Sequence, residues 1–220
     1  MPSSTSDIIA SMILVTGSTG FIGKNFVRKL EENALNFRLL LTPGSVGGGL
    51  PKGKNFDLVL SSMEDVGSLR SAFNQVDTIF HLAGVEQEGL KADLNQFEIR
   101  NLEIFTSVAR QAGVKRFFYI SHLGADKNSA YGLLKAKGLG EEIVKKSGLK
   151  YTIFRSSWLF GEDDHFSQSI ARMIKKFLGF FFLPGEGKVL LQPLWIDDFV
   201  TALLWSMDLP QTANQIVEVG

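Results

Sequence analysis

The stretch "ILVTGSTGFIGKNFVRKL", residues 13–30, decides the fold, because it joins a short apolar run to an amphipathic one through three evenly spaced glycines. These are Gly17, Gly20 and Gly23. Glycine lets a turn tighten and lets the backbone approach a ligand, while the following helix offers free N–H groups and a partial positive charge at its N-terminus. A strand before the glycines and a helix after them predict a site for the pyrophosphate of a dinucleotide.

The rest of the chain repeats this alternation of short apolar runs and longer amphipathic stretches. Strands that are apolar on both faces and separated by helices predict an α/β fold of the Rossmann type, a doubly wound parallel sheet with helices on both faces. We expect strands at residues 12–17, 37–42, 57–61, 77–84, 116–121, 151–156 and 214–219. We expect helices at Phe21–Glu32, Glu64–Asn74, Asn95–Ala112, Ala130–Lys146 and Phe199–Met207.

The length of 220 residues suits one domain with a substantial core. We expect residues 1–11 to be a flexible tail and residues 12–220 to form a single nucleotide-binding domain. The segment 42–55 is rich in glycine and proline, which predicts a surface loop. The first ten residues lack the features of a secretory signal, and no apolar run reaches the roughly 18 residues of a membrane-spanning helix, so we expect a soluble, cytoplasmic protein.

The charge and cysteine content exclude several classes of function. The 23 basic residues are balanced by 23 acidic ones, which leaves no excess positive charge to bind a nucleic acid. The absence of cysteine excludes disulfides, thiolate metal sites and cysteine nucleophiles, and it fits a reducing compartment. We therefore expect no nucleic acid partner and no metal site.

The end of the second predicted strand bears on the choice between NAD and NADP. An acidic residue there binds the ribose hydroxyls of NAD, and an arginine there binds the 2′-phosphate of NADP. The strand ends "RLLLTPGS", with Thr42 at its tip, and Arg38 lies inside it. Lysines at positions 24, 52 and 54 are further candidates for a phosphate. We expect NADP or NAD as the cofactor, with a lean towards NADP.

Several motifs together resemble the short-chain dehydrogenase/reductase superfamily in its extended and atypical branches, which include proteins like the NAD-dependent epimerases and dehydratases. They are "TGSTGFIG" at 16–23, "HLAG" at 81–84, "AGVKRFFYIS" at 112–121, "YGLLK" at 131–135, "YTIFRSSWLFGEDD" at 151–164 and "LQPLWIDDFV" at 191–200. Within the branch, the chain is most similar to relatives of the nucleotide-binding accessory subunit of mitochondrial complex I and to the NmrA-like group.

The resemblance implies both a cofactor site and a catalytic site. The cofactor residues that it implies are Gly17, Ser18, Thr19, Gly20, Phe21, Ile22, Gly23, Thr42, Leu82, Ala83, Gly84, Lys135, Arg155, Ser156 and Ser157. In active members a tyrosine gives or takes the substrate proton, and a lysine four residues later lowers the pKa of that tyrosine and holds the nicotinamide ribose. Tyr131 and Lys135 match these two, and a helix would place them on one face.

The sequence departs from the pattern at two positions. The catalytic hydroxyl usually follows the serine that ends the fifth strand, but that position is His122 here, one residue after Ser121. Side chains alternate across a strand, so these two point in different directions, and either is a candidate for the third catalytic group. Ser156 stands where a proline usually follows the arginine. Three functions stay open: an oxidoreductase or epimerase, a nucleotide-holding structural or assembly factor, and a redox sensor.

Residues 161–195 are expected to contribute to the substrate lobe. The cluster Phe177–Leu183 is strongly apolar and follows a basic segment, so it predicts either packing within the lobe or contact with an isoprenoid, a quinone, a membrane surface or a protein partner. The chain ends at "NQIVEVG", where members of the branch continue, which indicates either a truncated chain or an unusually small lobe. The oligomeric state stays open.

Overall fold

The computed structural model describes residues 12–43, 56–84, 99–176, 188 and 190–220. The predicted tail at 1–11, most of the predicted loop at 42–55 and the Phe177–Leu183 cluster lie outside these residues. Within them, seven parallel strands form one sheet in the order β3-β2-β1-β4-β5-β6-β9, which confirms the predicted fold class. The strands are β1 (Met12–Thr16), β2 (Phe37–Leu41), β3 (Phe56–Leu60), β4 (Val76–His81), β5 (Arg116–His122), β6 (Tyr151–Ser156) and β9 (Gln215–Val219).

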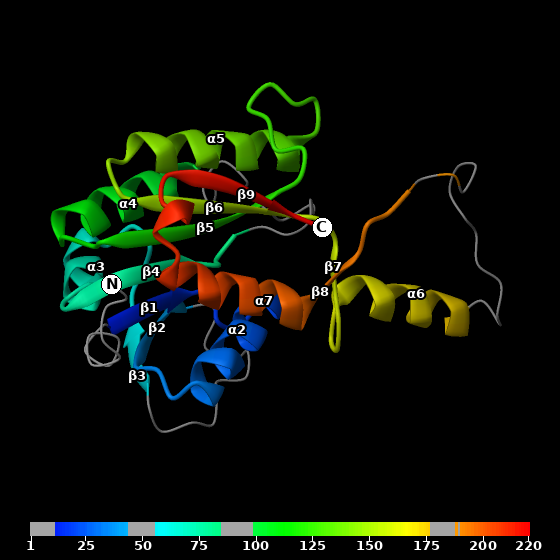
Figure 1. The fold of residues 1–220 in the computed structure, drawn as a ribbon, viewed down its shortest axis with the longest axis horizontal. Coiled ribbons are helices and arrows are strands. Elements are labelled where there is room, and N and C mark those ends of the chain that lie inside the picture. Colours follow the sequence, from blue (N-terminus) through cyan, green and yellow to red (C-terminus); the bar gives the residue numbers. More distant parts are fainter. Residues whose placement is uncertain (1–11, 44–55, 85–98, 177–187, 189) are drawn as a thin grey trace.

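Helices cover both faces of the sheet (Figure 1). One face carries α2 (Phe21–Glu32) and α7 (Ile196–Trp205), and the other carries α3 (Val66–Ala72), α4 (Asn101–Gln111) and α5 (Gly132–Lys146). In α2 the apolar residues recur at helical spacing, so Ile22, Phe26 and Leu30 are buried against the sheet while Lys24 and Arg28 stay exposed. Each face of the sheet therefore has its own apolar core.

The order of the strands creates a topological switch point beside β1. From β1 the chain proceeds outward to β2 and β3, and it then returns to β4 on the other side of β1 and proceeds to β5, β6 and β9. Ligands of open parallel sheets bind at the carboxyl ends of the strands, where the order reverses. The glycine loop follows β1 at this edge, and the segments after β2, β4, β5 and β6 begin at the same edge.

Some element boundaries differ from the predictions. Helix α2 has the predicted bounds, whereas α5 begins at Gly132 because Tyr131 is its N-cap, with an extended backbone at φ −87° and ψ 123°. Helix α3 is shorter at both ends than predicted, and α7 begins earlier, at Ile196. Helix α4 begins at Asn101, and residues 95–98 of the predicted helix lie outside the described part.

The region after β6 contains structure that the sequence analysis did not assign. Helix α6 (His165–Lys176) stands beside a small parallel sheet of β7 (Leu159–Phe160) and β8 (Leu194–Trp195). Asp164 caps α6, because its carboxylate accepts hydrogen bonds from the backbone N–H of Ser167 at 2.7 Å and from the Ser167 hydroxyl. None of the helices in the described part is long and apolar enough to span a membrane.

Candidate nucleotide-binding and catalytic site

The glycine loop packs so closely against its neighbours that side chains would not fit. Gly17 has φ +72°, and a Cβ atom there would lie 2.5 Å from the backbone nitrogen of Ala83. A Cβ atom at Gly23 would collide with the carbonyl oxygen of Gly17. The Gly20 N–H donates to that same carbonyl at 3.0 Å and closes the turn. These contacts bring the start of α2 against the ends of β1 and β4, as the spacing predicts.

The N-terminus of α2 is suited to an anion. Its N-cap is Gly20, its first turn contains no acidic residue, and no side-chain cap bonds its first N–H groups within the described part of the chain. Backbone N–H groups at such a terminus favour a negatively charged ligand through their direction and through the helix dipole. This geometry fits a phosphate or pyrophosphate group.

A cleft of about 240 Å³ lies at the switch point. Its lining includes many of the predicted cofactor residues, namely Gly17, Ser18, Thr19, Gly20, Thr42, Leu82, Ala83 and Gly84. It also includes residues that the sequence analysis did not select, namely Leu40, Leu41, Met63, His81 and Asn101. The cleft thus runs from the glycine loop to the tips of β2 and β4.

Two buried polar atoms in the cleft lack a hydrogen-bond partner among the described residues. They are Oγ of Ser18, a residue that is 2% exposed, and Oδ1 of Asn101, a residue that is 8% exposed. A buried polar atom without a partner costs free energy, and a polar ligand in the cleft would offset that cost. Together with the anion site on α2 they fit a dinucleotide, which offers hydroxyl, phosphate and amide groups.

Buried polar contacts hold the end of β4 in place. Thr16 Oγ1 lies 3.1 Å from Nδ1 of His81 and accepts the N–H of Ala83 at 3.2 Å. The His81 ring is buried and stacks on Phe117 at 6.0 Å between ring centroids. These contacts fix the backbone of residues 81–84 beside the glycine loop.

Other predicted cofactor residues lie outside the lining of the cleft. Ile22 is 7% exposed and lies in the apolar core, and the partly buried Phe21 packs against the same core. Both side chains therefore anchor α2 to the sheet. Gly23 acts through its close approach to Gly17. The side chain of Ser156 is buried at the end of β6, and Oγ of Ser157 is a buried atom without a described partner. The cofactor roles of these residues stay predictions.

Tyr131 and Lys135 lie at the start of α5, where one helical turn connects them. The backbone N–H of Lys135 donates to the carbonyl of Tyr131 at 2.9 Å. Both side chains are exposed, Tyr131 at 72%, and neither makes a hydrogen bond or ion pair within the described residues. The pair is therefore accessible to a ligand, but neither residue lines the cleft beside the glycine loop.

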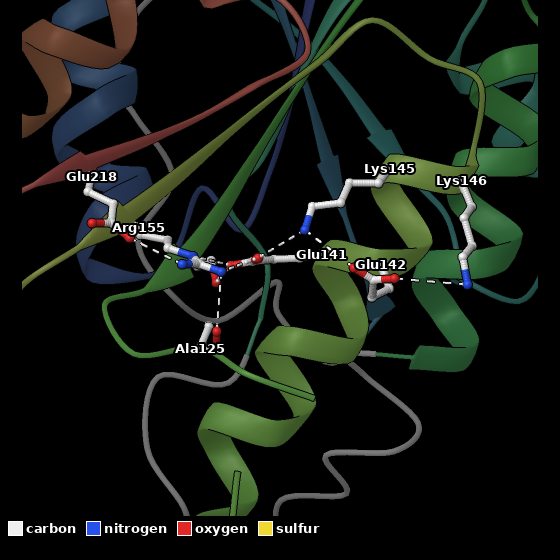
Figure 2. Close-up of polar contacts among 8 residues, drawn as sticks. Ala125, Glu141, Glu142, Lys145, Lys146, Arg155 and Glu218 are labelled. Atoms are coloured by element: carbon white, nitrogen blue, oxygen red, sulfur yellow. Dashed lines mark hydrogen bonds and ion pairs between the residues drawn. The ribbon is translucent and has the colours of Figure 1, made fainter. Parts of the chain in front are cut away.

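The structure places Ser121 and Arg155 in a buried ion-pair network centred on Glu141 of α5 (Figure 2). The Glu141 side chain is 1% exposed, and Arg155 donates to both of its oxygens, from Nε at 2.8 Å and from Nη2 at 2.7 Å. Ser121 donates its hydroxyl to Glu141 Oε1 at 2.7 Å. Arg155 also reaches Glu218 of β9 at 3.1 Å and the carbonyl of Ala125 at 3.2 Å.

This network limits the roles that Ser121 and Arg155 can have in ligand binding or catalysis. The hydrogen bonds that Arg155 donates to Glu141 raise the pKa of the Arg155 guanidinium, so Arg155 stays cationic. The Ser121 hydroxyl is fully buried and committed to a carboxylate, so no described contact brings it to Tyr131. His122, the other candidate for the third group, is half-buried at the end of β5 and already has contacts within the chain.

Arg38, considered above as a partner for a 2′-phosphate, is engaged elsewhere. It pairs with Asp57 of β3 at 3.1 Å and donates to the carbonyls of Ala72 at 2.7 Å and Asn74 at 2.9 Å. Arg38 does not line the cleft, whereas Thr42, just after β2, does. Lys24 is exposed in the first turn of α2, and Lys52 and Lys54 lie outside the described residues.

A glycine loop at a topological switch point, an anion site at the following helix and unpartnered polar atoms in the cleft define a Rossmann-type dinucleotide-binding protein. The chain belongs to the NAD(P)H-binding family, whose model matches residues 17–176. The resemblance to the atypical and extended short-chain dehydrogenase/reductases is confirmed, and NAD or NADP is the cofactor class. Among the described residues, no group of acidic, histidine or cysteine side chains forms a metal site.

Curated relatives and a solved structure support this placement. The chain is 27% identical over 217 residues to NADH dehydrogenase [ubiquinone] 1 alpha subcomplex subunit 9, mitochondrial, of Arabidopsis thaliana, covering 92% of this chain and 50% of the relative. It is 28% identical over 214 residues to NAD(P)H azoreductase of Xenophilus azovorans, covering 94% and 67%. The structure of MoeE5 in complex with UDP-glucuronic acid and NAD has the same fold, with a TM-score of 0.80 at 19% identity, covering 96% and 76%. The chain thus spans about half the length of the complex I relative.

Proposed function

We propose that the chain is an NAD(P)-dependent oxidoreductase or epimerase that acts on a small or apolar carbonyl or quinone-like substrate. The observation that supports catalysis most directly is the Tyr131 and Lys135 pair, whose side chains are exposed and make no hydrogen bond or ion pair within the described residues. The name of the azoreductase relative, an NAD(P)H-dependent reductase, agrees with it.

The chain's own residues would divide the work as follows. Reduction of a carbonyl requires a hydride at carbon, which the bound nicotinamide supplies, and a proton at oxygen. In this proposal the Tyr131 phenol would donate that proton, and the Lys135 ammonium would stabilise the phenolate that remains. Ser18 and Asn101 would bind polar groups of the nucleotide, and the first turn of α2 would bind its phosphates.

The test compares single variants of the purified protein against a panel of quinones and aldehydes. Tyr131→Phe keeps the ring but removes the proton donor, so turnover is expected to fall by about 10²- to 10⁴-fold with nucleotide affinity unchanged. Tyr151→Phe, at a half-buried tyrosine in β6, is the matched control and should keep turnover. Lys135→Ala should reduce both turnover and nucleotide affinity, while Lys146→Ala at the far end of α5 should affect neither. Turnover that survives Tyr131→Phe would contradict the mechanism.

The second candidate is a protein that holds its nucleotide for structure or assembly, or senses its redox state, without turnover. It is favoured by the hydrogen bond that the Ser121 hydroxyl donates to Glu141, because Ser121 is then not available to orient a substrate oxygen. The name of the complex I relative agrees with it. This candidate predicts no turnover in the unmodified protein, no effect of Tyr131→Phe, and a lower Tm in Lys135→Ala through weaker nucleotide occupancy.

For the nucleotide itself we propose a preference for NADP over NAD. The tip of β2 carries Thr42 and no acidic residue to select the ribose hydroxyls of NAD, and the exposed Lys24 lies one turn into α2. We expect NADPH to bind at least as tightly as NADH in a fluorescence titration, and Lys24→Gln to weaken NADPH more than NADH. A clear preference for NADH would reverse the assignment.

A further inference from the structure

The described part of the lobe after β6 contains an apolar groove that no element of the nucleotide site uses. The groove has a volume of about 320 Å³. Its walls are Trp158, Phe160, Ser167, Ile170, Ala171, Ile174 and Pro193, which we call the lobe groove. The one hydroxyl side chain in that wall, Ser167, donates to Asp164. The lobe groove therefore favours an apolar occupant such as an acyl chain.

Helix α6 forms one side of the lobe groove and is amphipathic. Figure 1 shows α6 extending away from the layers of the main sheet. Every described side chain from Ser167 to Lys176 is exposed apart from Ile170, which is half-buried. At 3.6 residues per turn, Ile170, Met173 and Ile174 share one side of the helix. Met173 is 42% and Ile174 is 39% exposed, so this apolar side lacks a covering partner among the described residues.

The charges of α6 point to an anionic partner. Arg172, Lys175 and Lys176 lie on the side opposite the apolar one, and the helix contains no acidic residue. Within the described chain Arg172 bonds only to Gln168 and Ser169 of its own helix, and no ion pair joins these three cations to an acidic residue. This local excess of positive charge occurs in a chain whose total charge is zero.

Aromatic residues border the same surface. Phe160 and Trp195 pack edge to face at 5.2 Å between ring centroids, and they are 37% and 40% exposed. Tryptophan is enriched where protein meets the headgroup region of a bilayer, because its ring is apolar and its N–H is polar. A second copy of the chain is a poorer match for this surface, since it would bring the same three cations without acidic residues to meet them.

We propose that α6 and the lobe groove dock on the surface of an anionic membrane. The apolar side of α6 and the groove would contact acyl chains, and Arg172, Lys175 and Lys176 would contact anionic headgroups. A bound helix of this kind lies in the plane of the interface and does not span the bilayer. This docking is independent of the nucleotide, because none of the residues involved lines the nucleotide cleft.

The test is co-sedimentation of the full chain with vesicles of phosphatidylcholine alone and of equal parts phosphatidylcholine and phosphatidylserine. We expect binding to the mixed vesicles that weakens with added salt. Lys175→Gln combined with Lys176→Gln should weaken it roughly fivefold for each cation removed. Ile170→Ser combined with Ile174→Ser should weaken it roughly tenfold for each isoleucine.

Matched controls separate this surface from general charge and hydrophobicity. Lys146→Gln combined with Lys150→Gln removes two exposed cations elsewhere, and Leu60→Ser removes a leucine of edge strand β3 that is 54% exposed. Both controls should bind vesicles as the unmodified chain does, and all variants should keep their nucleotide affinity.

Three outcomes would overturn the proposal: no vesicle binding, binding that does not depend on phosphatidylserine, or binding that both α6 variants retain. A dimer in light scattering that Ile170→Ser and Ile174→Ser dissolve, without vesicle binding, would assign the surface to a second copy instead.

Discussion

The two sides of the switch point position the site by different physical means. On the β1 and β4 side, backbone atoms determine the geometry, since Gly17 and Gly23 allow a close approach that any side chain would prevent. On the β5 and β6 side, charged side chains determine it, since Glu141 ties α5 to Ser121 of β5 and Arg155 of β6 (Figure 2). The geometry of the first side thus depends on glycines that lack a side chain, and that of the second side depends on contacts between polar and charged side chains.

This difference matters because the two means fail differently. A side chain introduced into a backbone contact creates overlap that the fold relieves only by moving the loop away from the cleft. Loss of one partner of a buried ion pair leaves the other charge buried without compensation, which lowers stability while the surrounding backbone can keep its path. Substitutions on the first side should therefore act on nucleotide binding, and those on the second side mainly on stability.

The largest effect is expected from Gly17→Asp, which should abolish nucleotide binding. The residue has φ +72°, its Cβ atom would meet the Ala83 nitrogen, and its carboxylate would repel phosphate. Isothermal titration calorimetry measures the loss. Gly113→Asp is the matched control, because Gly113 has φ +79° but no atom within 4 Å of its Cβ position. It should cost about 1–2 kcal/mol of stability and leave binding intact. Unchanged binding in Gly17→Asp would disprove the nucleotide site.

The next effect is expected from Arg155→Leu, which leaves the Glu141 carboxylate buried with its main partner removed. The free energy of unfolding should fall by about 3 kcal/mol. Glu218→Gln is the control, since Glu218 is the exposed partner of the same arginine, at 58%, and its loss should cost under about 1 kcal/mol. Urea unfolding of both variants measures the two values. Equal losses of unfolding free energy in the two variants would show that the buried Arg155–Glu141 pair stabilises the fold no more than the exposed Arg155–Glu218 pair.

The same contrast explains which parts of the site the sequence predicts. The glycine spacing, the bounds of α2 and the cleft residues at the ends of β1, β2 and β4 are local features, and the sequence predicts them. The network is non-local, since Ser121 and Glu141 are 20 residues apart and Arg155 and Glu218 are 63 apart. In the sequence Glu141 resembles an ordinary surface charge of an amphipathic helix, and only the adjacent strand ends bury it.

Three other features of the structure differ from the predictions made from the sequence, and each difference has its own cause. Asn101 lies within a helical pattern, and nothing in its neighbourhood marks its side chain as part of the cleft. Tyr131 falls just outside α5, because the chain enters that helix through an extended residue, and the apolar periodicity does not define such a boundary. Helix α6 is absent from the predictions, although Asp164 and the spacing of Ile170, Met173 and Ile174 indicate it, because the strongly apolar residues 177–183 that follow obscure the helical period.

A smaller effect is expected from Ser121→Ala, because this substitution tests a structural role of Ser121 separately from a catalytic one. Loss of the hydroxyl removes one hydrogen bond to Glu141 and should cost about 1.5–3 kcal/mol of stability. Because the hydroxyl is buried, turnover in any active preparation should change little compared with Tyr131→Phe. Thermal unfolding and a reductase assay on the same preparations measure both. A loss of turnover as large as that of Tyr131→Phe, with stability unchanged, would place Ser121 among the catalytic residues instead.

The smallest effect is expected at Asp65, an exposed charge that contrasts with the buried Glu141. Asp65 caps α3, and the N–H groups of Ser68 at 3.2 Å and Gly67 at 3.0 Å donate to its Oδ1 and hold the pKa of its carboxyl below the ordinary value of 3.8. A carboxyl whose pKa is lower in the folded state stabilises the fold fully above its unfolded pKa, and it loses that contribution as the pH falls through the folded pKa.

Asp65→Asn keeps a capping side chain but removes the titration. The Tm difference between the unmodified chain and Asp65→Asn should therefore be small and constant near neutral pH, and it should shrink as the pH falls below 3.8. A Tm difference in favour of the unmodified chain that grows in acid would show that the helix cap does not stabilise the carboxylate form.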